Sequence, residues 1–265
     1  MLNLYSLNHL HAQAQYWQEQ YCALSQQPLN VIFVENINIK FLRQNPELSL
    51  ILDDDGLHLA WNSMKMQPAW QDEIYRLKHA NTKNELLARA CYQQQGQNIL
   101  DCTAGLGHDG LLLASLGLNV TLIERHPILY LLLLATWQNA LHHPQLKIYA
   151  ERMHIVHAES ADYLTQIQPK QYDVIYLDPM FPQRDANQKQ AKKQAQVKKQ
   201  MQVLHHLLSL EHEIDLGENL LSLAQAKSKR VIVKRPRHAE ALNQQMPQHQ
   251  WLGDAVRFDG YFQLD

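Results

Sequence analysis

The stretch Tyr-Leu-Asp-Pro-Met-Phe-Pro, residues 176–182, sets an acid, two prolines and an aromatic ring directly after an apolar segment. The carboxylate of Asp178 or the carbonyl of Pro179 could accept the hydrogens of an exocyclic amine on a nucleobase and favour its pyramidal form, which exposes the nitrogen lone pair. The ring of Phe181 could stack on that base, a contact worth roughly 1–3 kcal/mol. The three residues are candidate catalytic residues for N-methylation of a base, although an Asp-Pro pair alone is more often only a strand-ending turn.

A glycine-rich loop, residues 101–110, follows an apolar strand and opens a helix. Its glycines satisfy a literal G-x-G-x-x-G, and Glu124 ends the next strand, where a ribose-binding acid is expected. Nicotinamide dinucleotides and S-adenosylmethionine both need this geometry. The acid at the end of the first strand, Asp101, favours S-adenosylmethionine, because it could meet the methionine ammonium but would be badly placed beside a pyrophosphate. Asp101, Gly105, Gly107 and Glu124 are therefore candidate cofactor-binding residues.

Two polar residues after the third predicted strand are further candidates for cofactor binding. Ser160 and Asp162 lie where the fold would hold an adenine ring. A lone glycine turn is often only a tight connection, and Glu124 with Arg125 could be a surface ion pair worth little. The combined order of acid, glycine loop, acid, serine and acid, each at the carboxyl end of a strand, favours a cofactor site over these structural interpretations.

Two basic segments could hold a nucleic acid. The formal net charge is -2, so such an attraction must be local. Basic runs are usually solvated helix faces, but an enzyme that flips a base must also hold the phosphates on either side of it. The candidate RNA-binding residues are Arg184, Lys189, Lys192, Lys193, Lys198, Lys199, Lys234, Arg235 and Arg237.

Strand and helix patterns alternate from about residue 82 onward and must position these side chains. The predicted strands are residues 98–102, 119–124, 153–158, 172–178 and 230–234. This alternation predicts an open, mostly parallel α/β sheet with ligands at the carboxyl ends of its strands. The final segment is expected to add antiparallel strands around Asp259-Gly260.

The first part of the chain alternates apolar and polar residues, and Asp55-Gly56 predicts a hairpin turn between two strands. We therefore expect a small α+β N-terminal domain, residues 1–80, and a main domain, residues 81–265.

The composition, 265 residues with 46% hydrophobic content, is that of a globular chain. Three widely spaced cysteines argue against a disulfide framework and a zinc site, and the histidines give no convincing ligand set, so no metal is expected. The N-terminus lacks a signal-peptide pattern, and the apolar run 128–137 is shorter than the roughly 20 residues that a membrane span needs. We expect a cytoplasmic protein without membrane contact.

The motifs TAGLGHDG, LIERHP, HAES, YLDPMFP, VKKQM and RVIVKRP, in this order, resemble the RsmJ family of small-subunit (16S) ribosomal RNA guanine-N2 methyltransferases. The likeness covers about residues 98–240 and extends weakly to RFDGY. It implies a class I S-adenosylmethionine-dependent methyltransferase, Rossmann-like, with a small N-terminal domain. The implied substrate is the N2 amine of one guanine in the 3′-terminal region of that RNA, free or in the assembled small ribosomal subunit. S-adenosylhomocysteine is the implied product, and no protein partner is inferred.

Motif matching transfers the family's cofactor contacts to particular positions of this chain. They are His108, Asp109, Glu124, Arg125, Ser160, Ala161 and Asp178. The family usually has arginine in place of His108, which makes the charge of that contact pH-dependent or absent. The family also carries a basic, glycine-rich stretch before the core, where this chain has YRLKHANTKNELL.

Three other functions remain open on the residues alone. The Asp-Pro-Met-Phe tetrad also permits methylation of adenine N6 or cytosine N4, and only the resemblance selects guanine. The literal glycine motif permits a nicotinamide-dependent oxidoreductase. An RNA-binding module without catalysis is the third alternative, and the acids Asp101, Glu124 and Asp178 argue against it.

Overall fold

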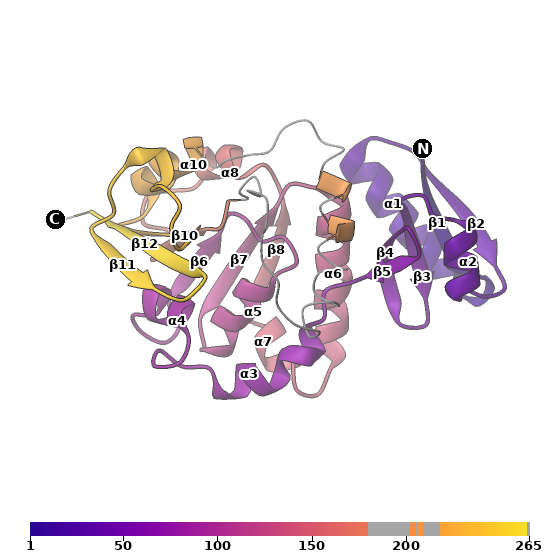
Figure 1. The fold of residues 1–265 in the computed structure, drawn as a ribbon, viewed down its shortest axis with the longest axis horizontal. Helices are drawn as coiled ribbons and strands as arrows, with labels where there is room; N and C mark the ends of the chain where they lie inside the picture. Colours follow the sequence, from indigo (N-terminus) through magenta and orange to yellow (C-terminus); the bar gives the residue numbers. More distant parts are fainter. Residues whose placement is uncertain (180–201, 205, 209–217, 264–265) are drawn as a thin grey trace. The chain divides into compact units, whose positions relative to one another are not determined.

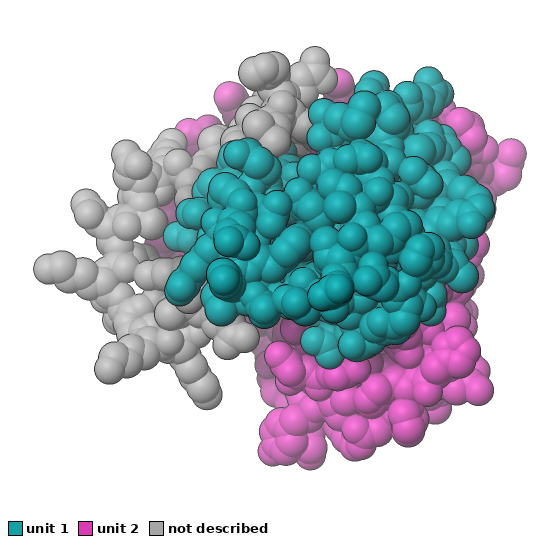
Figure 2. Space-filling view, turned by 90° about the vertical axis from the view of Figure 1, so that its right-hand side faces the viewer, with its two compact units in different colours: residues 1–68, 182–214 teal, residues 69–181, 215–265 magenta. Residues whose placement is uncertain are grey.

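The computed structural model describes residues 1–179, 202–204, 206–208 and 218–263 of the chain (Figure 1). The chain divides into two compact units, which Figure 2 shows in different colours. Unit 1 comprises Met1–Pro68 and Pro182–Ile214, and unit 2 comprises Ala69–Phe181 and Asp215–Asp265.

Unit 1 is built on a sheet with the strand order β2-β1-β3-β4-β5. Its strands are β1 (Leu2–Leu7), β2 (Leu29–Val34), β3 (Ser49–Asp53), β4 (Gly56–Trp61) and β5 (Met64–Met66). Strand β1 pairs in parallel with β2 and β3, whereas β3, β4 and β5 are antiparallel neighbours. The predicted hairpin at Asp55-Gly56 is confirmed, since Asp53 pairs with Gly56 across the turn.

Two α-helices of unit 1, α1 and α2, lie within the described residues 1–68. Helix α1 (His11–Ser25) follows the short 3-10 helix η1 (Asn8–Leu10), contacts β1 and β2, and buries Ala14, Trp17 and Tyr21. Helix α2 (Ile39–Gln44) begins at Asn38, whose side chain accepts a hydrogen bond from the backbone of Phe41 at 3.0 Å. Residues 1–68 thus combine strands with helices.

Unit 2 contains a sheet with the strand order β11-β12-β10-β9-β6-β7-β8. Its strands are β6 (Asn98–Asp101), β7 (Asn119–Glu124), β8 (Met153–His157), β9 (Val174–Leu177), β10 (Arg230–Pro236), β11 (His249–Leu252) and β12 (Val256–Phe262). The five strands from β6 to β10 are parallel, and β11 and β12 add an antiparallel edge. The predicted open, mostly parallel α/β sheet is confirmed.

Helices cover both faces of this sheet and enclose two apolar cores. One face carries α4 (Leu86–Cys91), α5 (His108–Ser115), α6 (Pro127–His142) and α7 (Lys147–Ala150). The other carries α8 (Ser160–Gln166) and α10 (Glu218–Lys227). The elements η2 (Trp70–Glu73), α3 (Ile74–His79) and η3 (Leu242–Gln244) lie in the connections.

The division between the units differs from the expected boundary at residues 80 and 81. Residues 69–80 belong to unit 2, because Trp70 and Leu77, which are 1% and 2% exposed, pack into its larger core. Residues 182–214, far along the sequence, are assigned to unit 1.

The antiparallel strands expected around Asp259-Gly260 are confirmed as β11 and β12. Both residues lie inside β12, and the hairpin turns where the backbone N–H of Gly253 donates to the carbonyl of Val256 at 2.9 Å. Gly260 serves a close approach, since a Cβ there would lie 2.8 Å from the ring of Trp251. Asp259 is fully buried and pairs with Arg257 at 2.8 Å, which accounts for an acid within the strand.

Candidate active site

The site lies where the order of the parallel strands reverses. From β6 the chain adds β7 and β8 on one side and then returns to β9 on the other, so the carboxyl ends of β6 and β9 border the crevice in which such sheets bind ligands. Asp101 ends β6, and Asp178 follows β9 directly.

Thr103 joins these two acids. Its backbone N–H donates to Oδ1 of Asp101 at 2.9 Å, and its hydroxyl oxygen accepts from the backbone N–H of Asp178 at 2.6 Å. A single residue of the glycine loop thereby fixes the position of Asp178, the first residue after β9, relative to Asp101.

Asp101 is buried, at 1% exposure. Burial raises the pKa of Asp101 to about 8, and the negative charges of Asp109 and Asp178 add to this, while hydrogen bonds from Thr103 oppose it. A buried acid in this state fits a ligand that brings a positive charge, such as the ammonium of S-adenosylmethionine.

The glycine loop turns through two left-handed residues, Gly105 and Gly107, with φ of +54° and +76°. At Gly107 a Cβ would lie 2.5 Å from Leu133 and 2.8 Å from the ring of Trp70, so protein atoms fill that side. At Gly105 the nearest atom would be 3.9 Å away, which leaves space against the backbone. The indole N–H of Trp70 donates to the carbonyl of Leu106 at 3.0 Å and holds the loop from behind.

Glu124 ends β7 and supports the same loop. Its Oε2 accepts from the backbone N–H of Gly105 at 2.8 Å, and its Oε1 accepts from that of His126 at 2.8 Å. Burial raises the pKa of Glu124, although these backbone hydrogen bonds oppose the shift. Each carboxylate oxygen can accept more than one hydrogen bond, so a ribose would share the acid with the loop.

The residues after β8 are placed by the backbone of Cys102, the first residue after β6. The hydroxyl of Ser160 donates to the carbonyl of Cys102 at 2.5 Å, which brings the start of α8 beside the glycine loop. Ala161 is partly buried next to it, and Asp162 is exposed in the first turn of α8. Arg125 pairs with Glu159 at 3.5 Å.

A lysine lies between two acids, Asp109 and Asp178. The Nζ of Lys234, on β10, is 2.8 Å from Oδ2 of Asp109 and 2.8 Å from Oδ2 of Asp178. The hydroxyl of Tyr176 donates to the same oxygen of Asp109 at 2.6 Å. Lys234 was predicted from the sequence to bind RNA, whereas in the structure its ammonium group forms ion pairs with Asp109 and Asp178.

These contacts shift the ionisation of all three charged groups. Burial would raise the pKa of Asp109, but the charge of Lys234 and its hydrogen bond bring it below the usual range. Burial raises the pKa of Asp178, and the charge of Lys234 offsets this rise only in part. Burial would lower the pKa of Lys234, but the two carboxylates raise it, so the lysine stays charged.

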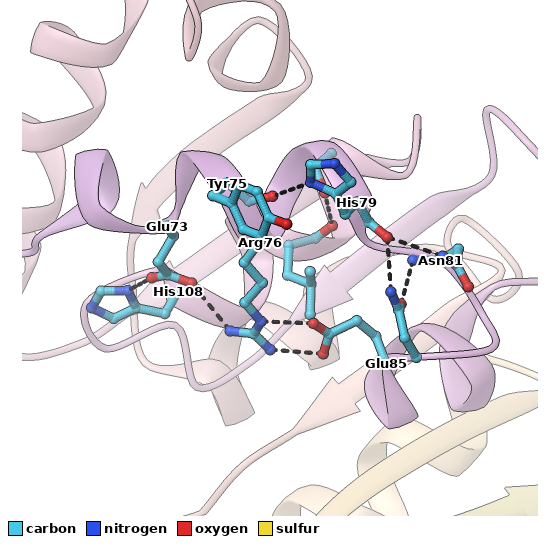
Figure 3. A network of polar contacts seen from close by, with 10 residues as sticks. Glu73, Tyr75, Arg76, His79, Asn81, Glu85 and His108 are labelled. Carbon is cyan, nitrogen blue, oxygen red and sulfur yellow. Dashed lines mark hydrogen bonds and ion pairs between the residues drawn. The ribbon is translucent and has the colours of Figure 1, made fainter. Parts of the chain in front are cut away.

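A second polar network reaches the loop from α3 and the segment that follows (Figure 3). His108, the first residue of α5, bonds through Nδ1 to Oε1 of Glu73, and Glu73 pairs with Arg76 at 3.1 Å. Arg76 in turn makes two hydrogen bonds to Glu85, at 2.7 and 2.8 Å. The acid that contacts His108 is Glu73, which ends η2 just before the stretch that departs from the family's basic, glycine-rich pattern. That stretch supplies Arg76 and Glu85 to the same network.

Comparison with known proteins identifies the family. Residues 33–263 match the family model described as putative SAM-dependent methyltransferase. The chain is 51% identical over 236 residues to ribosomal RNA small subunit methyltransferase J of Acinetobacter baylyi, covering 88% of this chain and 87% of that one. It is 36% identical over 249 residues to the protein of the same name from Psychrobacter arcticus, covering 87% and 84%.

The chain belongs to the ribosomal RNA small subunit methyltransferase J family. A crystal structure of a SAM-dependent methyltransferase from Neisseria gonorrhoeae is also similar, with a TM-score of 0.69, 25% sequence identity and coverage of 98% of this chain and 95% of that one. The fold class, the methyltransferase activity and S-adenosylmethionine as cofactor, all expected from the sequence, are confirmed. The family match begins at residue 33, so it reaches well beyond the motifs between residues 98 and 240.

The geometry of the site shows which of the candidate residues lie together. Asp101, the glycine loop, Glu124, Ser160 and Asp178 come together at the carboxyl edge of the sheet. The other catalytic and RNA-binding candidates divide into two groups. Pro179 is buried in the described chain, whereas Phe181, Arg184, Lys189, Lys192, Lys193, Lys198 and Lys199 lie outside the described residues.

The two arginines of the second basic cluster bond to backbone carbonyls. Arg235 is 7% exposed and donates to the carbonyl of Glu240 at 2.6 and 2.9 Å, and Arg237 donates to that of Gly253. Arg235 therefore presents little of its side chain to a phosphate. In the part of the chain that the structure describes, no helix is long and apolar enough to span a membrane, and no cluster of side chains forms a metal site.

Sequence reasoning missed four residues of the methyltransferase J site, Thr103, Tyr176, Trp70 and Glu73. The signal for Tyr176 was its place two residues before Asp178 on a strand, which puts both side chains on the same face of the sheet. Trp70 and Glu73 carried no comparable signal, because they precede the sheet and reach the loop only through tertiary contacts.

Proposed function

We propose that this chain transfers a methyl group from S-adenosylmethionine to the N2 amine of a guanine in the 3′-terminal region of small-subunit (16S) ribosomal RNA. The observation that carries the chemistry is the link through Thr103, which holds the buried acid Asp101 and the catalytic acid Asp178 at one edge of the sheet. The names of the Acinetobacter and Psychrobacter relatives support the small subunit as the source of the RNA.

The residues of the switch point fit the cofactor. Asp101 would meet the ammonium, the open backbone of Gly105 would lie against the nucleoside, and Glu124 would accept from the ribose. Ser160 and Ala161 would border the adenine. Bound there, S-adenosylmethionine supplies a methyl group on a positively charged sulfur.

Asp178 would then prepare the target amine. Its carboxylate accepts a hydrogen of the amine, and the lone pair freed from the ring forms the new N–C bond as the C–S bond breaks and its electrons stay on sulfur. The amine proton leaves to Asp178 or to water. Phe181 is proposed to stack on the guanine, and the lysine-rich segment 184–199 to hold the phosphates beside it.

The assembled small subunit, rather than free RNA, is proposed as the substrate form, and the cytoplasm as the site of action. A single guanine is easier to select in a folded particle, where shape as well as base identity can be read. Free RNA is the alternative that the same assay separates.

The deciding experiment incubates the protein and labelled S-adenosylmethionine with small subunits that lack the modification and, separately, with free 16S RNA, and identifies the labelled nucleoside after digestion. Asp178→Ala is the test variant. Asp254→Asn, an exposed acid in the turn between β11 and β12, is the matched control.

We expect N2-methylguanosine from the native protein and the Asp254 control, and none from the Asp178 variant. Label in methyladenosine or methylcytidine would keep the chemistry and overturn the base. Absence of label together with tight NAD binding would replace the proposal with the oxidoreductase.

A further inference from the structure

A lysine beside Asp178 is held by acids on both sides. Lys234 comes from β10, the strand paired in parallel with β9, and places Nζ 2.8 Å from Oδ2 of both Asp109 and Asp178. The three side chains are between 25% and 35% exposed, so solvent reaches the group without filling it. Asp109 is held in turn by the hydroxyl of Tyr176 at 2.6 Å.

This arrangement is a poor phosphate site. One lysine between two carboxylates leaves the group with a net negative charge, which repels a phosphate. Binding a phosphate would also require Lys234 to leave two ion pairs of 2.8 Å that are only partly exposed to solvent. The lysine is therefore better placed to act on Asp178 than on the RNA backbone.

We propose that Lys234 is a positioning residue for methyl transfer, which holds Asp178 through Oδ2 and so directs Oδ1 to the target amine. The inference rests on the proposed function and deepens it. Two anchors then fix the acid: Thr103 holds its backbone N–H, and Lys234 holds one of its two carboxylate oxygens. A carboxylate fixed in this way loses little freedom when the base arrives.

Lys234 also controls the charge of Asp178. The groups that face Asp178 are Lys234 from β10, Asp109 from α5 and Asp101 from the end of β6. Burial and Asp109 raise the pKa of Asp178, and Lys234 is the group that lowers it. Tyr176 is neutral, because burial raises the pKa of its hydroxyl well above the usual value.

Loss of the lysine charge would therefore leave Asp178 among acids and in a low dielectric. The protonated form would then persist to higher pH. A protonated carboxyl accepts hydrogen bonds poorly and cannot take the amine proton, so the fall in rate at low pH should move to higher pH.

The test compares three variants by the pH dependence of kcat at saturating S-adenosylmethionine and small subunits. Lys234→Met removes the charge but keeps the length of the side chain, and Lys234→Arg keeps the charge. Asp109→Asn removes the acid that competes for the lysine and retains an oxygen for Tyr176. The carboxyl signal of Asp178 is followed by carbon NMR in the same proteins without substrate.

For Lys234→Met we expect kcat at pH 7 to fall about 10- to 100-fold, with partial recovery at pH 9 and affinity for RNA changed less than about threefold. We compare the pH at which kcat falls in acid and the pH at which the NMR signal of Asp178 titrates. Both should be higher than in the native protein in Lys234→Met and lower in Asp109→Asn. In Lys234→Arg both should stay near the native values. If Lys234→Met does not fold, Asp109→Asn carries the same test with a shift of opposite sign, and Lys234→Arg is its control with the charge kept.

A different result overturns the inference. Lys234→Met could weaken RNA binding and lower its salt dependence by about one phosphate contact, with no change in the pH at which kcat falls or Asp178 titrates. That result would make Lys234 an RNA ligand. If the native protein transfers no methyl group, the proposed function fails, and the NMR titration still decides whether Lys234 controls Asp178.

Discussion

Oε2 of Glu124 accepts a hydrogen bond from the backbone N–H of Gly105 at 2.8 Å, so the acid that ends β7 helps to form the glycine loop. The acid and the loop were separate signals in the sequence. In the fold they are one unit, because the other oxygen of Glu124 accepts from His126 at the start of α6. A change at Glu124 should therefore alter cofactor binding and loop stability together.

Glu124→Gln should show this double effect. An amide keeps one acceptor and turns an NH2 group toward a backbone N–H, which leaves a buried donor unpaired at a cost of about 1–3 kcal/mol. We expect that loss in the free energy of unfolding, measured with urea, and affinity for S-adenosylmethionine at least about tenfold weaker by calorimetry. Glu151→Gln, in the exposed pair with Lys147 on α7, is the matched control and should change stability by less than about 0.5 kcal/mol. An unchanged cofactor affinity in Glu124→Gln would remove Glu124 from the cofactor site.

Asp101 should make cofactor binding pH-dependent. Burial raises the pKa of Asp101 to about 8, so below that pH the free protein holds it mostly protonated. An ammonium binds the ionised form, and binding must then release a proton. Affinity for S-adenosylmethionine should rise roughly tenfold or more from pH 6 to pH 7.5.

Calorimetry in buffers of different ionisation enthalpy measures this proton release directly. Methylthioadenosine, which lacks the amino acid part, is the matched ligand control and should bind with little pH dependence. Asp101→Asn should abolish the difference between the two ligands. Equal pH dependence for both ligands would show that Asp101 does not meet the ammonium.

The two left-handed glycines should respond differently to alanine. At Gly107 the new methyl group would overlap Leu133 and Trp70, and with the strain of a φ of +76° we expect a loss of about 2–4 kcal/mol in the free energy of unfolding. At Gly105 only the backbone strain of about 1–2 kcal/mol remains, because the nearest atom is 3.9 Å away.

Gly105→Ala should therefore fold and still lose cofactor affinity, since its methyl group would point into the space assigned to the nucleoside. Thermal unfolding and calorimetry separate the two effects. Native affinity in Gly105→Ala would mean that the cofactor does not approach this part of the loop.

Stability of unit 1 should fall in acid because of a buried network on its sheet. His58 bonds to Oδ1 of Asp53 at 3.0 Å, and Lys65 pairs with Oδ2 of the same acid at 2.5 Å. Burial lowers the pKa of His58 below its ordinary value of 6.5, so its contribution is complete above pH 6.5 and is lost as the pH falls below it. Burial would raise the pKa of Asp53, but Lys65 and His58 lower it below 3.8, so its contribution is lost only in stronger acid.

Urea unfolding between pH 7.5 and 5 should show a decline that His58→Gln removes, because glutamine can donate to Asp53 without titrating. Hydrogen exchange of the amides of β3 and β4 assigns the decline to this sheet. A native decline that persists in His58→Gln would place its origin elsewhere.

The lysine-rich segment should provide the salt dependence of RNA binding. Neutralising Lys192, Lys193, Lys198 and Lys199 with glutamine should reduce the slope of log affinity against log salt by up to about 3–4 and leave kcat at saturating RNA nearly unchanged. Lys147→Gln, on α7, is the control, because its partner is Glu151 at 3.7 Å. An unchanged slope in the fourfold variant would remove the segment from the RNA interface.

The parts of the site that follow from strand order could be predicted from the sequence, since each candidate acid ends or follows a strand and parallel strands share their carboxyl edge. Asp101, Glu124 and Asp178 are of this kind. The role of Lys234 could not be predicted, because its position near a strand end fits both a phosphate contact and an internal ion pair, and only the register of β10 against β9 decides. The boundary at Ala69 depends on where Trp70 packs, which local periodicity does not encode.

The assignment of residues 182–214 to unit 1 limits how this chain can be rearranged. His206 stacks on Trp61 with ring centroids 4.1 Å apart, so a residue from the second half of the chain contacts the sheet formed by the first residues. Deletion of residues 1–68 would remove Trp61 and expose the ring of His206 to solvent. The N-terminal part is therefore not expected to be lost or exchanged by simple fusion without a compensating change at His206.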